Sequence, residues 1–173
     1  MELSDADLAA RVVDTLNRFV GSLHAVRCTA AFWIAHAEKP GFRFAAKYSL
    51  QMTFGTAMIT LRKFHDLHLG GHLERLVGED TEAAPECAWI LGECERRNTR
   101  DAANLLFAHY APQRADPPLS SEEVLAIIHD GGWATEEEFL EWIGPMIHRL
   151  CSIRDRITTK YSLPIGSRPP EDL

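Results

Sequence analysis

The stretch RVVDTLNRFVGSLHAVRCTAAFWIAHA, residues 11–37, decides the fold class. Apolar residues recur in it at alternating steps of four and three, the spacing of one face of an α-helix. The pattern predicts one amphipathic helix of about 30 residues, from near Ser4 to the break at Lys39-Pro40-Gly41, because proline cannot continue a helix. The apolar stripe consists of Val12, Leu16, Phe19, Leu23, Val26, Ala30, Trp33 and Ala37.

A second apolar stripe follows that break and predicts a second long helix, from about Phe42 to Leu67, ended by Gly70-Gly71. The short connection between the two helices predicts that they pack antiparallel. A short helix is expected over 72–77. The members of the second stripe are Leu50, Phe54, Ala57, Leu61 and Phe64.

The rest of the chain also has helical patterning. Pro85 suits the first turn of a third helix, which we expect to reach His109 with the polar insert ERRNTRD, residues 95–101, interrupting its apolar face. The proline-rich stretch APQRADPPLS, residues 111–120, predicts a loop. A capping box from Ser120 to Glu123 opens the next helix, which we expect to end at Gly131-Gly132.

A second capping box, Thr135 to Glu138, opens the last helix, and Gly144-Pro145 is expected to kink or split it. The stripe of this helix is Phe139, Ile143, Met146, Leu150, Ile153 and Ile157. Together these patterns predict an all-α protein, an antiparallel helical bundle of four main helices plus one or two short helices. We expect one bundle domain over 1–163 and an irregular C-terminal tail over 164–173.

The composition narrows the function. A net charge of −7 argues against a broad nucleic-acid surface, so that any RNA site has to be a local basic patch. No signal-peptide pattern and no run of about 18 apolar residues is present, which predicts a cytoplasmic protein without a membrane span. The four scattered cysteines are expected to be free thiols. The tryptophans, with Met52 and Met58, are most simply core residues.

The end of the last helix carries the first candidate site. The apolar stripe continues by its own spacing from Ile157 to Lys160, which places this lysine at the edge of the core with its ammonium free to bind something. Arg154 flanks the same edge, and Asp155 beside it can orient a guanidinium. The simpler interpretation is that the basic residues here only stabilise a helix C-terminus, by about 0.3–1 kcal/mol each.

The run Arg154-Asp155-Arg156-Ile157-Thr158-Thr159-Lys160 resembles the R-[N/H/D]-x4-H motif of the HEPN superfamily, helical bundles that include RNA-cleaving toxins and abortive-infection proteins. The stretch MITLRKFHDLHLGGHLERLV, residues 58–77, is similar to the corresponding region of the abortive-infection branch. The resemblance implies a homodimer with a shared RNA cleft. In that cleft Arg154 would bind phosphate, and Asp155 would orient the guanidinium.

Lys160 stands where the motif has its histidine. Lysine has an ordinary pKa of about 10.4, so it supplies charge without accepting a proton near neutral pH. The resemblance therefore implies a degenerate toxin-type ribonuclease or an abortive-infection defence protein that binds RNA or a nucleotide, with a possible cognate protein partner. The sequence leaves open whether the chain is an enzyme.

A second basic cluster, in the polar insert, is a candidate for phosphate binding, because guanidinium groups are planar two-pronged donors. Its members are Arg97, Asn98 and Arg100, to which the last helix adds Arg156. The alternative is a solvated helix face paired with Glu93 and Glu95.

His65, Asp66, His68 and His72 are metal-ligand residue types, but the Gly-Gly turn separates the last from the others, so neither a metal nor a cofactor is expected. A metal-dependent enzyme around His65, Asp66 and His68 is left open as a third alternative. No nucleotide-binding or hydrolase motif is present. The alternative function is a noncatalytic protein-interaction or regulatory bundle whose basic clusters only solvate helix ends, in which case Arg154→Ala changes stability little.

Overall fold

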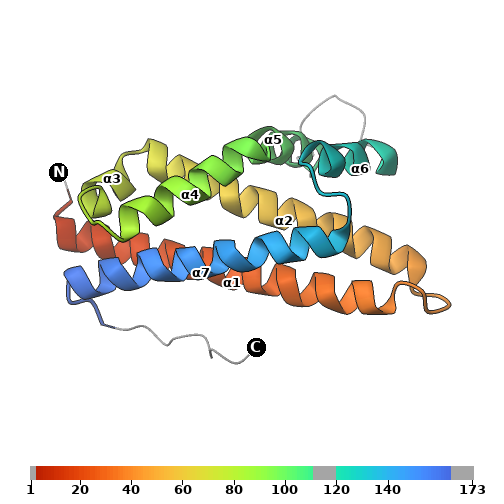
Figure 1. Ribbon diagram of the computed structural model, residues 1–173, viewed down its shortest axis with the longest axis horizontal. Coiled ribbons are helices and arrows are strands. Elements are labelled where there is room, and N and C mark those ends of the chain that lie inside the picture. The colour runs from red at the N-terminus through yellow and green to blue at the C-terminus, as the bar shows by residue number, and fades with distance from the viewer. Residues whose placement is uncertain (1–2, 111–119, 165–173) are drawn as a thin grey trace.

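The computed structural model describes residues 3–110 and 120–164, and within these ranges the chain is helical and has no strand (Figure 1). The all-α prediction is confirmed. Of the predicted loop at 111–120 and the predicted tail at 164–173, residues 111–119 and 165–173 lie outside the described residues. The helices are α1 (Asp5–His36), α2 (Arg43–Leu69), α3 (His72–Val77), α4 (Ala83–Arg96), α5 (Thr99–Tyr110), α6 (Ser121–Asp130) and α7 (Glu136–Lys160).

The long helix α1 lies along both α2 and α7, while α4 packs on α7 and α5 packs on α2. In Figure 1, α1 and α4 run in one direction and α2 and α7 run in the other. The predicted stripes supply the core: those of α1 and α2 are buried from Val12 to Ala30 and from Phe54 to Phe64. Every member of the α7 stripe is buried as well.

Side chains cap the helices where the sequence predicted them. The Ser120 amide donates to Glu123 Oε2 at 2.6 Å, and the Glu123 amide donates to Ser120 Oγ at 3.2 Å. The Glu138 amide donates to Thr135 Oγ1 at 3.2 Å. Both predicted boxes therefore satisfy first-turn amides that have no partner within the helix.

The expected third helix is two helices, α4 and α5, so the prediction of one helix through the polar insert was wrong. Asn98, between them, has φ 49°, a left-handed conformation that asparagine tolerates better than most residues. The Thr99 hydroxyl donates to the Cys94 carbonyl at 3.3 Å, which satisfies an acceptor at the end of α4. The polar insert ends one helix and begins the next.

In contrast, α7 passes through Pro145 without being split. Trp142 and Ile143 before the proline and Met146 and Ile147 after it are all buried, so both halves of the helix are held against the core. Packing of an apolar face supplies most of the stability of a protein helix, and here it exceeds the cost of the lost hydrogen bond.

The four cysteines all lie in the described ranges and form no disulfide, as predicted, and they differ in exposure. Burial raises the pKa of Cys87 to about 12 and that of Cys94 to about 11, whereas Cys28 is exposed. None of the helices in the described ranges has the length and apolar character needed to cross a membrane.

Candidate functional site

Arg154, the first residue of the predicted α7 site, points into the contact between α7 and α1. The residue is only 7% exposed. Its guanidinium lies 2.7 Å from Asp155 Oδ1 through Nη2 and donates to Asn17 Oδ1 at 3.4 Å. A buried charge requires such partners. The structure therefore brings Arg154 and Asp155 together, as predicted, but Arg154 faces helix α1.

Lys160 lies at the edge of the α7 stripe and reaches a different helix. Its ammonium donates to the Leu76 carbonyl at 2.7 Å. Leu76 is in the last turn of α3, where the carbonyl groups receive no hydrogen bond from an amide of the same helix. Lys160 thus caps α3, and this contact ties the end of α7 to the short helix.

Arg156 pairs with a third region, the loop between α3 and α4. It lies 3.2 Å from Asp80 and 3.0 Å from Glu82. Asp80 also accepts hydrogen bonds from the amides of Ala83 and Glu82, and these bonds, the one from Ala83 above all, together with Arg156 lower the pKa of Asp80 below its ordinary 3.8. The basic groups of Arg154, Arg156 and Lys160 therefore have three separate sets of partners.

Arg97 holds the loop between α6 and α7. Its Nη1 donates to the carbonyl groups of Gly131 at 2.9 Å and Gly132 at 2.6 Å, and its guanidinium carbon lies 4.8 Å from the centre of the Trp133 ring. Burial lowers the pKa of Arg97. A Cβ on Gly131 would collide with the Trp133 ring, so the loop fits tightly around this indole.

The other residues predicted to bind phosphate are placed differently. Asn98 is the left-handed residue at the junction of α4 and α5. Arg100 is exposed and has no ion pair within the described part of the chain. The expected pairing with Glu93 is made by Arg96, at 2.9 Å, and this hydrogen bond is the main cause of the lowered pKa of Glu93.

The histidine-rich segment shows no metal centre. Across residues 3–110 and 120–164, no group of three or more histidine, cysteine or acidic side chains could hold a metal ion. Asp66 instead lies 3.9 Å from Arg62.

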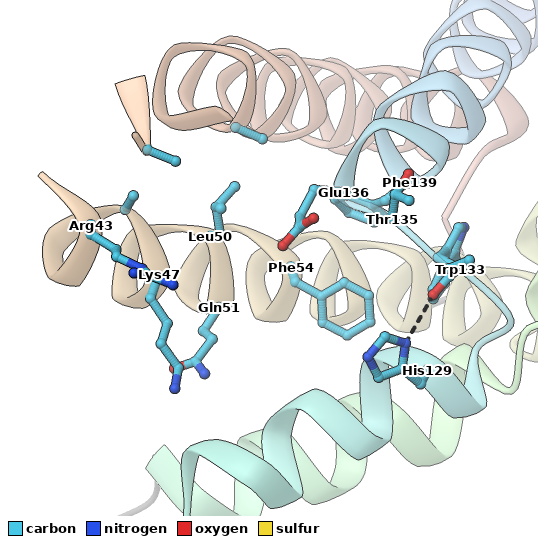
Figure 2. A pocket seen from close by; sticks show the side chains of 14 residues that line it. Arg43, Lys47, Leu50, Gln51, Phe54, His129, Trp133, Thr135, Glu136 and Phe139 are labelled. Atoms are coloured by element: carbon cyan, nitrogen blue, oxygen red, sulfur yellow. Dashed lines mark hydrogen bonds between the residues drawn. The ribbon is translucent and has the colours of Figure 1, made fainter. Parts of the chain in front are cut away.

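The sequence did not predict a pocket of about 300 Å³ between the end of α1, the start of α2 and the segment that joins α6 to α7 (Figure 2). Arg43, Lys47, Gln51 and Phe54 line it from one face of α2. These four residues are spaced four, four and three positions apart, so the sequence alone shows that they share a helix face. The sequence does not indicate which residues form the opposite wall. That wall contains Trp133, Thr135, Glu136 and Phe139.

Beside the pocket, residues 27–52 form what we term the hairpin end, which comprises the last turns of α1, the connection and the first turns of α2. In Figure 1 it projects beyond the start of α7. Phe44, Tyr48 and Met52 form a stripe along α2 and are 74%, 48% and 52% exposed. The interpretation of Met52 as a core residue was wrong, because among the described residues this face of α2 is exposed.

The hairpin end is also basic. Residues 27–52 contain four lysines and arginines and one acid, Glu38, a net charge of +3 in a chain of net charge −7. None of these four cations has an ion pair or side-chain hydrogen bond to another described residue. They are Arg27, Lys39, Arg43 and Lys47. The hairpin end is therefore a local basic patch, the kind of surface that the composition requires of any RNA site on this acidic protein.

Comparisons with protein-family models, with curated proteins and with solved structures found no match.

Proposed function

We propose that the chain is an HEPN-like protein that binds RNA or a nucleotide without cutting it, and that the RNA binds at the hairpin end. The observation that carries the proposal is the combination of four unpaired cations with exposed aromatic rings. The rings of Phe44 and Tyr48 lie 4.6 Å apart, next to Arg43 and Lys47 on the same helix. Proteins that bind single strands combine basic grooves with aromatic side chains on which bases stack, each worth about 1–3 kcal/mol.

The contacts of the motif residues support binding over cleavage. The guanidinium of Arg154 is buried against Asn17, and the ammonium of Lys160 is bound to the Leu76 carbonyl. Arg154, at 7% exposed, is turned away from any reacting phosphate, and no histidine occupies position 160 to act as a base. On this basis the chain is a degenerate relative of the toxin-type ribonucleases or an abortive-infection protein.

The finer description of the fold belongs to the same proposal. We regard the helices as an antiparallel four-helix bundle in which α4 and α5 together take one position. Support comes from the opposite directions of α1 and α2 in Figure 1. Cytoplasmic location, a homodimer and a cognate protein partner remain predictions.

A second candidate is the noncatalytic interaction bundle. It is favoured by the stripe of Phe44, Tyr48 and Met52, because large exposed apolar patches often mark protein interfaces.

The test is binding of a fluorescein-labelled single-stranded RNA of mixed sequence, followed by anisotropy at low and at physiological salt. We expect binding that weakens with salt, and a smaller salt dependence when Arg43 and Lys47 are both changed to alanine, by about 0.7 per cation lost. Phe44→Ala/Tyr48→Ala should weaken binding at least tenfold. The matched control is Arg18→Ala, which removes an exposed cation that is paired with Asp14 on α1.

Absence of RNA binding at low salt, or equal binding by all variants, contradicts the proposal. Cleavage of the RNA by the wild-type protein that is lost in Arg154→Ala contradicts its non-cleaving part. Without RNA binding, a self-association or protein complex that Phe44→Ala abolishes would favour the interaction bundle.

A further inference from the structure

We infer that the pocket beside the hairpin end binds a small amphipathic anion, with an apolar body inside the pocket and a carboxylate or phosphate group at Gln51, Lys47 and Arg43. Its volume of about 300 Å³ is at the lower end of the range found for small-molecule sites. Such sites have mostly apolar walls and a few polar groups that fix the ligand.

Gln51 is the strongest indication of a ligand. The residue is 7% exposed, and its Nε2 is buried without a hydrogen-bond partner within the described chain. A buried donor without an acceptor costs free energy, and most buried polar groups in native proteins have partners. An oxygen atom of a bound ligand would satisfy this amide.

The charges at the pocket favour an anion. Arg43 and Lys47 lie two turns and one turn before Gln51 on the same face of α2, and neither has a described partner. Figure 2 shows Glu136 reaching toward the pocket from the first turn of α7. Two cations thus oppose one carboxylate, and Glu136 weakens the attraction for an anion without reversing it.

Aromatic side chains form the apolar part of the pocket. Phe54 lies with its ring centre 5.2 Å from Phe139 and 5.4 Å from Trp133, which is 1% exposed. The His129 ring reaches the same region and is held by its hydrogen-bonding contact with the Trp133 carbonyl at 3.3 Å (Figure 2). An alkyl or aryl body is the chemistry that this surface accepts.

The inference does not depend on RNA binding. The two proposals share Arg43 and Lys47, but the buried Gln51 belongs only to the pocket, and Phe44 and Tyr48 do not line it. Each proposal can therefore fail without the other: the double variant Phe44→Ala/Tyr48→Ala should leave the pocket unchanged.

The experiment is calorimetric titration of the protein with decanoate below its micelle concentration. Decyl phosphate distinguishes the two kinds of anionic group, and decylamine is the charge control. We expect one decanoate per chain and no binding of decylamine. Gln51→Leu should weaken binding about tenfold, because a hydrogen bond to a charged group is lost. Lys47→Ala should also weaken it, whereas Glu136→Gln should strengthen it.

Met52→Ala is the matched control, since Met52 neighbours Gln51 but lies outside the pocket. Gln51→Leu removes an unsatisfied buried donor, so it should fold at least as stably as the wild type, as thermal melting will show. The inference is overturned if neither decanoate nor decyl phosphate binds, if Gln51→Leu binds them as tightly as the wild type, or if decylamine binds equally well.

Discussion

The two ends of the molecule use basic residues in opposite ways. At the end formed by α3 and the last turns of α7, Arg154, Arg156 and Lys160 contact α1, the α3–α4 loop and α3. At the hairpin end, Arg43 and Lys47 have no such contacts within the described chain. Similar side chains thus join helices at one end and remain available to a ligand at the other. A basic motif in a sequence therefore indicates a site only where the fold leaves its charges unpaired.

The largest effect on stability is expected for Arg154→Ala. The change leaves the Asn17 side chain without its buried partner and opens space between α7 and α1, so the free energy of unfolding should fall by about 2–3 kcal/mol. Urea unfolding followed by circular dichroism measures this. Arg18→Ala, at an exposed pair, should cost about 0.5 kcal/mol or less. A loss no greater than that of Arg18→Ala would remove the distinction between the two ends.

Arg97→Ala should have the next largest effect. It removes two hydrogen bonds to the α6–α7 loop and the contact with Trp133, for about 1–2 kcal/mol. The same unfolding experiment, with tryptophan fluorescence as a second signal, measures the loss. Arg100→Ala removes an exposed charge three residues away and should change stability by no more than about 0.5 kcal/mol. Equal effects of the two substitutions would contradict the role given to Arg97.

A smaller effect depends on pH. Because the pKa of Asp80 is lower in the folded chain than the ordinary 3.8, this carboxylate stabilises the fold above that value. The stabilisation is lost as pH falls through the lowered pKa. Melting temperatures between about pH 2 and pH 6 should therefore depend less on pH in Asp80→Asn than in the wild type. An unchanged pH dependence would show that Asp80 is not held by Ala83 and Arg156.

The smallest effect on stability is expected at the hairpin end. Replacement of Lys39 and Arg43 by alanine should change the free energy of unfolding by no more than about 0.5 kcal/mol, because neither has a partner among the described residues. The same protein should bind RNA more weakly in the anisotropy experiment. A marked loss of stability would mean that these cations serve the fold, as those of α7 do.

Much of the fold could be predicted from the sequence because it depends on local spacing. The stripes of α1, α2 and α7 and both capping boxes depend on residues that are three or four positions apart in the sequence. The break at Asn98 could not be predicted, since the apolar stripe continues on both sides of it and only one residue changes its backbone conformation. At Pro145 the local rule predicted a kink or a split, and the split does not occur because the residues on both sides of the proline are buried in the core.

The site was harder to predict, because its contacts are long-range. Asn17, Leu76 and Asp80 are far from α7 in the sequence, and nothing local identifies them as partners of its cations. Half of the pocket is visible as the polar face of α2 from Arg43 to Gln51. The other half depends on how the α6–α7 segment folds over α2.

Gly131 restricts the order in which substitutions can accumulate at positions 131 and 133. A side chain there would occupy the space of the Trp133 ring, so in a library of single substitutions position 131 should accept glycine alone. A smaller residue at 133 would have to come first and make room. Any evolutionary route to a larger pocket through this segment therefore passes through position 133 before position 131.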